Sequence, residues 1–175
     1  PTRTELNELI KHPLYANSYK SYPNDLVKVK QKQDNIQLAG MVEAVDQSLG
    51  TLVAQLKELG LLDDTIVFFT SDNGGMSVMN GTPTRIVSQR QLDAATSTSN
   101  LPLRGAKGWL YEGGIRVPMI VKWPQEGQKG TVCDEPVIST DFFPTILEML
   151  GVEHETSGID GQSFTALVQG KEMDR

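Results

Sequence analysis

The sequence has few of the residues that mark a disulfide-stabilised, membrane-spanning or nucleic-acid-binding protein. It contains one cysteine, Cys133, so no disulfide can form within the chain, and we interpret this thiol as a structural residue. No apolar run approaches the ~20 residues that a membrane helix requires. The net charge of −6 argues against a nucleic-acid surface, which needs a basic stripe. We therefore expect neither a membrane nor a nucleic acid as a partner.

The remaining composition is that of a globular domain. The 175 residues suffice for one domain with its own core, and 38% of them are hydrophobic and 22% charged. The polar N-terminus begins with Pro1 and shows no signal peptide, but a chain without an initiator Met says little about its compartment. We expect an irregular polar segment over residues 1–34 and a folded domain over residues 35–175. The oligomeric state stays open.

An apolar strand followed by a polar turn is the most informative stretch. Six consecutive β-branched or aromatic residues, Thr65–Thr70, predict a strand buried on both faces, as in a parallel sheet. It ends in Ser71-Asp72-Asn73-Gly74-Gly75, and ligands gather beyond the carboxyl ends of such strands. The oxygens of Asp72 and Asn73 suit Ca²⁺ or Mg²⁺ better than Zn²⁺. The same residue types also form ordinary turns, so a plain turn stays open at this point.

Periodicity predicts three helices and two further extended pieces. Apolar residues at spacings of three and four predict an amphipathic helix from about residue 35 to Gly60, a natural C-cap. Further along, the pattern predicts a strand over Met119–Pro124 and a brief strand or extended piece over Val137–Thr140. Helices are predicted from Asp141 to about Leu150 and from Phe164 to Gln169. The expected apolar face of the first of these consists of Phe143, Ile146, Leu147 and Leu150.

A glycine-rich basic segment, Leu101–Pro118, has neither a helical nor a strand period. Four glycines allow close backbone approach, and a cation held near backbone amides makes an anion site. Lys107 is a compact point charge that suits a tetrahedral oxyanion. We interpret Arg104, Glu112 and Arg116 as a structural ion-pair network.

Between these two motifs lies a long polar loop, Met76–Asn100. A loop of this length is either functional or a surface excursion. Its position after the strand suggests a lid or a substrate-recognition loop, and its sequence does not decide between these readings. His12 and His154 lie in charged loops, and we interpret both as solvated side chains.

Taken together, the two motifs resemble those of the type I sulfatases. Thr65–Gly75 looks like the family's metal-binding strand, and Leu103–Pro118 is similar to its second glycine-rich motif. The resemblance runs from about residue 37 to residue 170. It implies an α/β alkaline-phosphatase-like fold, a mostly parallel sheet flanked by helices that is present here only in part. It also implies hydrolysis of sulfate esters, Ca²⁺ (occasionally Mg²⁺) bound by Asp72 and Asn73, and contact of Lys107 with the sulfate group.

The sequence also departs from the family pattern. The family's nucleophile is a formylglycine made from Cys or Ser within a Cys/Ser-x-Pro/Ala-x-Arg motif, which this sequence does not contain. The family's N-terminal Asp-Asp metal pair and its antiparallel C-terminal subdomain have no match either. We therefore expect residues 35–175 to be the C-terminal half of a sulfatase catalytic domain. On its own this chain should be inactive and bind metal weakly, because two ligands cannot fill the six to eight positions of Ca²⁺.

Two other functions stay open. One is a phosphatase, phosphodiesterase or phosphoethanolamine transferase of the same superfamily, although these depend on Zn²⁺ and more histidines than the two present. The other is a degenerate domain that serves as a binding or structural module. The expected partner is a small-molecule or carbohydrate sulfate ester, which the sequence does not identify further. The resemblance alone implies a periplasmic or secreted location.

Overall fold

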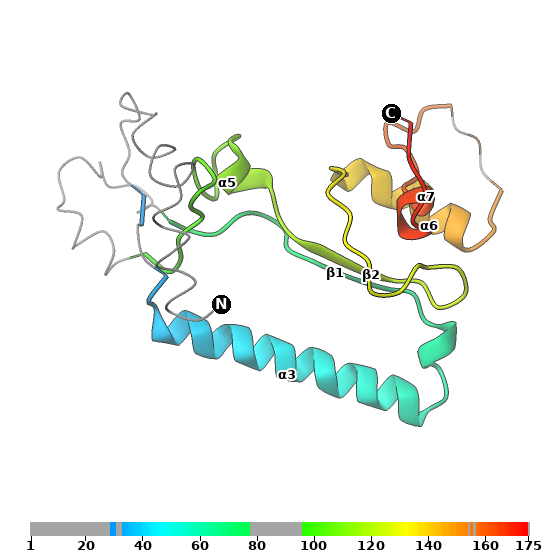
Figure 1. Cartoon of the computed structure of the whole chain (residues 1–175), viewed down its shortest axis with the longest axis horizontal. Helices are drawn as coiled ribbons and strands as arrows, with labels where there is room; N and C mark the ends of the chain where they lie inside the picture. Colours follow the sequence, from blue (N-terminus) through cyan, green and yellow to red (C-terminus); the bar gives the residue numbers. More distant parts are fainter. Residues whose placement is uncertain (1–28, 31–32, 78–95, 154, 156, 175) are drawn as a thin grey trace. The chain divides into compact units, whose positions relative to one another are not determined.

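A computed structural model describes residues 29–30, 33–77, 96–153, 155 and 157–174 (Figure 1). The chain divides into two compact units, one of Pro1–Leu49 with Thr70–Pro118 and one of Gly50–Phe69 with Met119–Arg175. In chain order the elements are α3 (Ile36–Glu58), η1 (Leu62–Asp64), β1 (Val67–Thr70), α5 (Glu112–Ile115), β2 (Met119–Lys122), η3 (Ser139–Asp141), α6 (Phe142–Met149) and α7 (Thr165–Val168). The interpretations of His12, of His154 and of most of residues 1–34 lie outside the described residues.

Local capping explains both ends of α3. At the N-terminus, Asn35 Oδ1 accepts a hydrogen bond from the backbone N–H of Leu38 at 2.9 Å, which satisfies one of the unpaired donors of the first turn. At the C-terminus, Gly60 has a φ of 70° and donates to Lys57 O, while Leu61 donates to Leu56 O at 2.8 Å. This is the Schellman arrangement, and only glycine adopts its left-handed residue without strain. The predicted helix and its glycine cap are confirmed.

The apolar stripe of α3 is much more exposed than an amphipathic pattern suggests. The helix has no buried residue. Val42, Val45 and Leu52 are 61%, 51% and 52% exposed, although a helix of this pattern normally buries its apolar stripe. Half-buried members of the stripe are Leu38, Leu49, Val53 and Leu56. The periodicity therefore predicted the helix correctly, but the described residues do not bury its apolar face.

The two strands, β1 and β2, form a two-stranded sheet. Thr70 Oγ1 donates to Pro118 O at 3.0 Å, so the end of β1 lies beside the start of β2. Lys122 Nζ, at the end of β2, donates to the carbonyl oxygens of Leu62 and Thr65, which precede β1. The two strands therefore run in opposite directions (Figure 1).

The burial of β1 differs from the prediction. Val67 and Phe68 are half-buried, whereas Phe69 and Thr70 are exposed. The prediction of a strand buried on both faces is therefore wrong for the described part of the chain. A run of apolar residues such as this one is typical of a central strand, whereas β1 and β2 are the only strands among the described residues.

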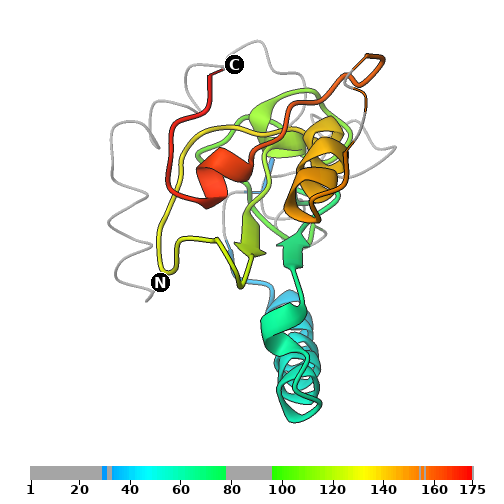
Figure 2. The same ribbon diagram turned by 90° about the vertical axis from the view of Figure 1, so that its right-hand side faces the viewer.

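Three phenylalanine rings form the centre of the second unit. Phe68 of β1 lies 5.6 Å from Phe142 and 6.3 Å from Phe164, measured between ring centroids. Phe142 and Phe164 are also 5.6 Å apart, and all three pairs have the edge-to-face geometry that aromatic quadrupoles favour. Phe164 is 1% exposed. This cluster connects β1 to α6 and α7, which lie side by side (Figure 2).

A buried polar network fixes the start of α6. Asp141 is fully buried, and its carboxylate accepts backbone N–H groups from Ile138 at 2.9 Å and from Gln162 at 3.0 Å. The hydroxyl of Thr145 donates to Asp141 O at 2.6 Å and accepts the N–H of Phe164 at 3.0 Å. Buried polar groups are tolerated only when they are paired in this way.

This network also reverses the predicted orientation of α6. The helix is found where it was predicted, but Phe143, Ile146 and Leu150 are 60%, 38% and 62% exposed. The buried residues of α6 are Pro144, Thr145 and Met149. The predicted apolar face is therefore wrong for Phe143, Ile146 and Leu150, whereas Leu147 is half-buried. The Thr145 hydroxyl, which sequence periodicity counts as polar, faces the core. Val137–Thr140 forms no strand, but the alternative of an extended piece holds at Ile138, whose φ is −123° and ψ 165°, before η3 begins at Ser139.

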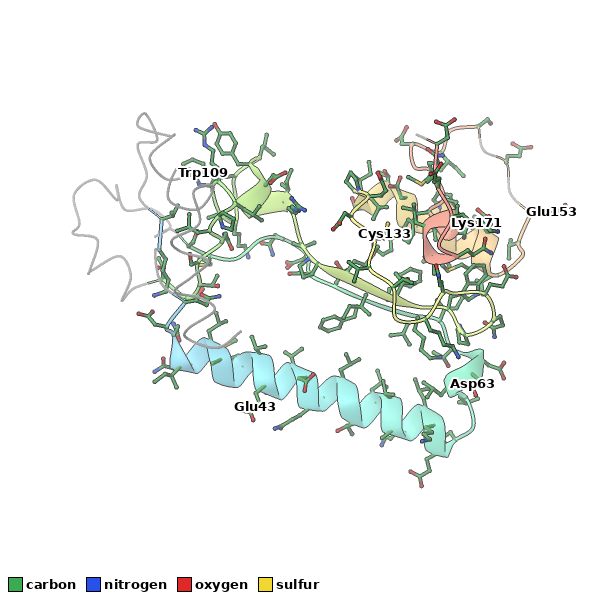
Figure 3. The ribbon with its side chains drawn as sticks, in the orientation of Figure 1. Glu43, Asp63, Trp109, Cys133, Glu153 and Lys171 are labelled. Carbon is green, nitrogen blue, oxygen red and sulfur yellow. The ribbon has the colours of Figure 1, made fainter. Side chains whose placement is uncertain are left out.

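The single cysteine of the chain lies at the surface. Cys133, labelled in Figure 3, is a free and exposed thiol. Its exposure gives no support to its interpretation as a structural residue, which stays a prediction. Among the described residues, no helix combines the length and the apolar character that a membrane span needs.

Replacing Thr145 by Val should destabilise the chain by about 1–3 kcal/mol, because the buried N–H of Phe164 would lose its acceptor while side-chain volume is kept. Urea unfolding followed by circular dichroism measures the change. Thr131→Val serves as the matched control, since Thr131 is exposed and donates to Gln128 O at 3.3 Å. Equal effects of the two substitutions would contradict the role of the buried hydroxyl.

Candidate active site

The loop after β1 holds the two predicted metal ligands. Asp72 is exposed and Asn73 is half-buried. The Asn73 side-chain nitrogen donates to Asp72 Oδ1, and Ser71 Oγ donates to the backbone oxygen of Asn73 at 3.0 Å. The Asp72 carboxylate and the Asn73 amide therefore contact each other, through the NH₂ group of Asn73.

Backbone crowding explains the glycines that follow. Gly74 donates its N–H to Gly114 O at 2.9 Å. A Cβ atom on Gly74 would lie 2.0 Å from Gly113 O, a distance at which the backbone itself must shift. Gly113 is buried, and a Cβ there would lie 2.4 Å from Gly105 O of the same glycine-rich segment. Gly74 is therefore required by close main-chain contact with a segment distant in sequence, and Gly113 by close contact within its own segment.

Lys107 lies in a loop that is hydrogen-bonded to the same segment. Its backbone N–H donates to Gly75 O at 3.1 Å, and its side chain is exposed. The glycines on either side of this turn, Gly105 and Gly108, have φ angles of +80° and +89°, which residues with a Cβ rarely adopt. The structure therefore joins the Asp72–Asn73 loop to the Lys107 loop through the main chain.

The side chain of Asn100 lies between these two loops. Its Oδ1 accepts the N–H of Gly75 at 3.1 Å, and its Nδ2 donates to Gly75 O at 2.7 Å. Nδ2 also contacts Ser77 Oγ and Gly105 O, both at 3.3 Å. The sequence analysis assigned no role to this residue. An amide-bearing residue immediately before the glycine-rich motif was the signal that could have identified it.

The segment before α3 is attached to the same region. Lys30 is 1% exposed, and its Nζ lies 2.9 Å from Asp34 Oδ1. Its backbone N–H donates to Ser77 O at 2.7 Å, and its carbonyl accepts from Ser99 Oγ at 2.8 Å. The side-chain amide of Gln33 hydrogen-bonds to Thr98 and Ser99. Composition gave no indication of a buried lysine in a segment predicted to be polar and irregular.

The described residues show one ion pair of the network predicted for the glycine-rich segment, together with a cation–π contact. Arg116 and Glu112 form an exposed pair at 3.5 Å. The guanidinium of Arg104 lies over the ring of Tyr111, 3.8 Å from its centroid, a cation–π geometry that no charge pattern predicts. Trp109, labelled in Figure 3, has its ring centroid 6.0 Å from that of Tyr111. The network prediction is confirmed for Glu112 and Arg116, while the guanidinium of Arg104 stacks on an aromatic ring.

Two predictions about this region extend beyond what the structure describes. Residues 78–95 of the long polar loop are outside the described residues, so its role as a lid or recognition loop stays a prediction. Within the described residues, no three His, Cys, Asp or Glu side chains gather into a metal-binding group. Asp72 and Asn73 can therefore supply only part of the coordination shell of a divalent cation.

The comparisons with known proteins agree with one another. A model of the family described as Sulfatase matches residues 11–152. The chain is 37% identical over 130 residues to a mouse (Mus musculus) steryl-sulfatase, covering 74% of this chain and 19% of that protein. It is 35% identical over 124 residues to mouse arylsulfatase J, covering 70% of this chain and 18% of that protein. The chain thus spans about a fifth of the length of the curated relatives it matches.

Similar solved structures include a sulfatase and a phosphonate monoester hydrolase. A crystal structure of Ps i-CgsB in complex with k-i-k-neocarrahexaose matches with a TM-score of 0.63 and 31% identity, covering 91% of this chain and 31% of that one. The PsFucS1 sulfatase from Pseudoalteromonas sp. matches with a TM-score of 0.58 and 34% identity, covering 78% and 25%. The phosphonate monoester hydrolase SpPMH from Silicibacter pomeroyi matches with a TM-score of 0.53 and 26% identity, covering 74% and 21%.

Gly74→Ala should destabilise the folded chain by about 1–3 kcal/mol or more, because the added methyl group would collide with the backbone at Gly113. Gly50→Ala is the control, since a Cβ at this position within α3 meets nothing within 4 Å. The control should stabilise the chain by roughly 0.5–1 kcal/mol, because alanine loses less backbone entropy in a helix. Urea unfolding of both variants measures the difference, and tolerance of alanine at Gly74 would contradict the described packing.

Proposed function

The chain belongs to the sulfatase family, and from this premise we propose that the complete protein hydrolyses sulfate esters. The observation that best supports this proposal is a pair of main-chain hydrogen bonds between the two family motifs. Gly74 donates to Gly114 O at 2.9 Å, and Lys107 donates to Gly75 O at 3.1 Å. Motifs that are some 30 residues apart in sequence are thus fixed against each other, as a shared site requires.

The likeness to solved sulfatases confirms the predicted fold class. The chain is part of an α/β alkaline-phosphatase-like fold, with a small sheet and flanking helices. The boundary expected between residues 34 and 35 stays a prediction.

We propose that Asp72 and Asn73 provide two oxygen ligands for Ca²⁺ or Mg²⁺. Both side chains contact each other in one loop, and a carboxylate with an amide oxygen is a donor set that these hard cations prefer. Asp72 and Asn73 would hold the cation, which would supply Lewis-acid chemistry for a sulfate oxygen. The remaining ligands and the formylglycine nucleophile would come from parts of the protein outside this chain.

Lys107 is proposed to contact the sulfate group. Its side chain is exposed, and its backbone is fixed to the loop of Asp72 and Asn73 through Gly75 O. A lysine ammonium offsets the negative charge that grows on the ester oxygens in the transition state, which is most effective when the ammonium is positioned beforehand. The flanking left-handed glycines and the Gly75 contact would supply that positioning.

A sulfated carbohydrate or small molecule is the proposed substrate. Among the similar structures, one holds k-i-k-neocarrahexaose and another holds its substrate D-glucosamine-2-N,6-O-disulfate. These ligands support a sulfated carbohydrate as the substrate without selecting one sugar. The likeness to steryl-sulfatases is the reason to test other sulfated small molecules as well. A periplasmic or secreted location remains part of the proposal.

A second candidate function is hydrolysis of phosphonate or phosphate monoesters. The likeness to the phosphonate monoester hydrolase SpPMH favours including it. The anion held by Asp72, Asn73 and Lys107 would again be tetrahedral, so these residues alone do not separate the two ester classes.

The complete protein that contains this chain should hydrolyse 4-nitrophenyl sulfate in the presence of Ca²⁺, whereas the purified 175-residue chain should show no turnover. The reason is that the nucleophile and most metal ligands are proposed to lie outside the chain. Release of 4-nitrophenol measures both reactions, with 4-nitrophenyl phosphate and a phenylphosphonate ester as parallel substrates. Turnover by the isolated chain would contradict the proposal that the nucleophile and most metal ligands lie outside it. If the complete protein hydrolysed none of these esters, the result would favour the alternative of a degenerate domain that serves as a binding or structural module.

Substitutions in the complete protein should separate the two proposed roles. Lys107→Ala should lower kcat/KM by about 10²–10³-fold without changing the metal concentration that gives half-maximal activity. Asp72→Ala should raise that metal concentration, because a cation ligand is lost. Steady-state kinetics across a Ca²⁺ titration measure both quantities. Lys129→Ala, an exposed lysine outside both motifs, is the control, and a similar loss in this variant would refute the role of Lys107.

A further inference from the structure

Asn100 makes a bidentate contact with one residue of the metal-ligand loop. Its amide accepts the Gly75 N–H at 3.1 Å and donates to the Gly75 carbonyl at 2.7 Å, so it pairs with Gly75 as a neighbouring strand would. The same nitrogen reaches Gly105 O at 3.3 Å, two residues before Lys107. These contacts also fix the orientation of the amide, because a reversed side chain would place its NH₂ group against the Gly75 N–H.

The carbonyl of Gly75 is the point where the two loops meet. It accepts hydrogen bonds both from Asn100 Nδ2 and from the backbone N–H of Lys107 at 3.1 Å. Gly75 is two residues from Asn73, so a shift of this carbonyl would move the metal-ligand pair and the lysine relative to each other. The side chain of Asn100 thus holds the atom on which the spacing of both groups depends.

Gly75 has no space for a side chain beside Asn100. A Cβ on Gly75 would lie 2.6 Å from Asn100 Oδ1 and 2.2 Å from Thr98 Cγ2. An acid of the same shape would direct a charged oxygen at the carbonyls of Gly75 and Gly105, which repel it. An apolar side chain would leave the half-buried N–H and carbonyl of Gly75 without the amide partner.

We propose that Asn100 is a positioning residue that sets the distance between the Asp72–Asn73 pair and Lys107, acting through the Gly75 carbonyl. This inference rests on the proposed function, since it assigns Asn100 a role at the same site. Asn100 itself need not touch the substrate or the metal. Its effect on catalysis would arise because small displacements of prepositioned groups cost a large part of the rate.

The test uses three variants of the complete protein, assayed with 4-nitrophenyl sulfate across a Ca²⁺ titration. Asn100→Asp keeps the shape and loses the donor, Asn100→Ala loses the whole amide, and Asn100→Ser keeps a short hydroxyl donor. We expect kcat to fall by about 10- to 100-fold in Asn100→Asp and Asn100→Ala, with a smaller loss in Asn100→Ser. The half-saturating Ca²⁺ concentration should rise in parallel.

A pH profile distinguishes positioning from general stabilisation. In Asn100→Asp, the carbonyls that face the new carboxyl raise its pKa above the ordinary value, because they disfavour the charged form. The protonated form carries an O–H that can donate to Gly75 O again. The activity of Asn100→Asp relative to wild type should therefore rise as the pH falls through that pKa. The corresponding ratio for Asn100→Ala should stay constant.

Gln33→Glu is the matched control. The Gln33 amide also bonds residues just before Asn100: it donates to Thr98 Oγ1 at 2.7 Å and accepts the Ser99 N–H at 2.9 Å. Both of these contacts lie outside Gly75 and the glycine-rich segment. The amide-to-acid change there should leave kcat, the half-saturating Ca²⁺ concentration and the pH profile as in wild type.

Each outcome decides the proposal. Folded Asn100 variants with wild-type kcat and Ca²⁺ dependence would overturn it, as would failure of all three to fold, which would make Asn100 a residue of general stability. A loss of kcat without pH-dependent recovery in Asn100→Asp would also count against it. If the wild-type protein hydrolyses no sulfate ester, the proposed function itself fails, and an active wild type with unaffected variants refutes only the positioning role.

Discussion

Direct contact between two stretches of main chain is the constraint on which this site depends. The loop after β1 and the glycine-rich segment approach so closely that Gly74 has no space for a Cβ beside Gly113 O. Hydrogen bonds from Gly74 to Gly114 and from Lys107 to Gly75 then fix the register of one loop against the other. Because main-chain atoms move little compared with long side chains, such a joint places functional groups reproducibly. The Asn100 amide adds a side-chain contact to the same carbonyl.

The sequence was sufficient for the elements whose signals are local. The 3.6-residue period and the capping glycine predicted α3, and the Asp-Asn-Gly-Gly turn marked the end of β1. The two long motifs also led to the correct family and fold class. Information of this kind is contained in short stretches of chain, where dihedral preferences and periodicity act directly.

Burial and side-chain pairing were less predictable, because they depend on what packs against each element. Periodicity placed Phe143 and Ile146 in the core, whereas Thr145 occupies it by bonding Asp141 and Phe164. Charge alone did not indicate that the guanidinium of Arg104 stacks on Tyr111. The main-chain hydrogen bonds of Lys30 and the side-chain hydrogen bonds of Asn100 join partners far away in sequence, which no local pattern specifies. The assignment of Asp72, Asn73 and Lys107 to a common site remains a prediction that the joined loops support.

The contact between Gly74 and Gly114 has a practical consequence for protein chemistry. It is made by an amide hydrogen and a carbonyl oxygen, so side-chain mutagenesis cannot remove it without adding bulk. Backbone editing by chemical ligation can do so. An ester in place of the peptide bond between Asn73 and Gly74 would delete a single donor while keeping every side-chain atom of the loop.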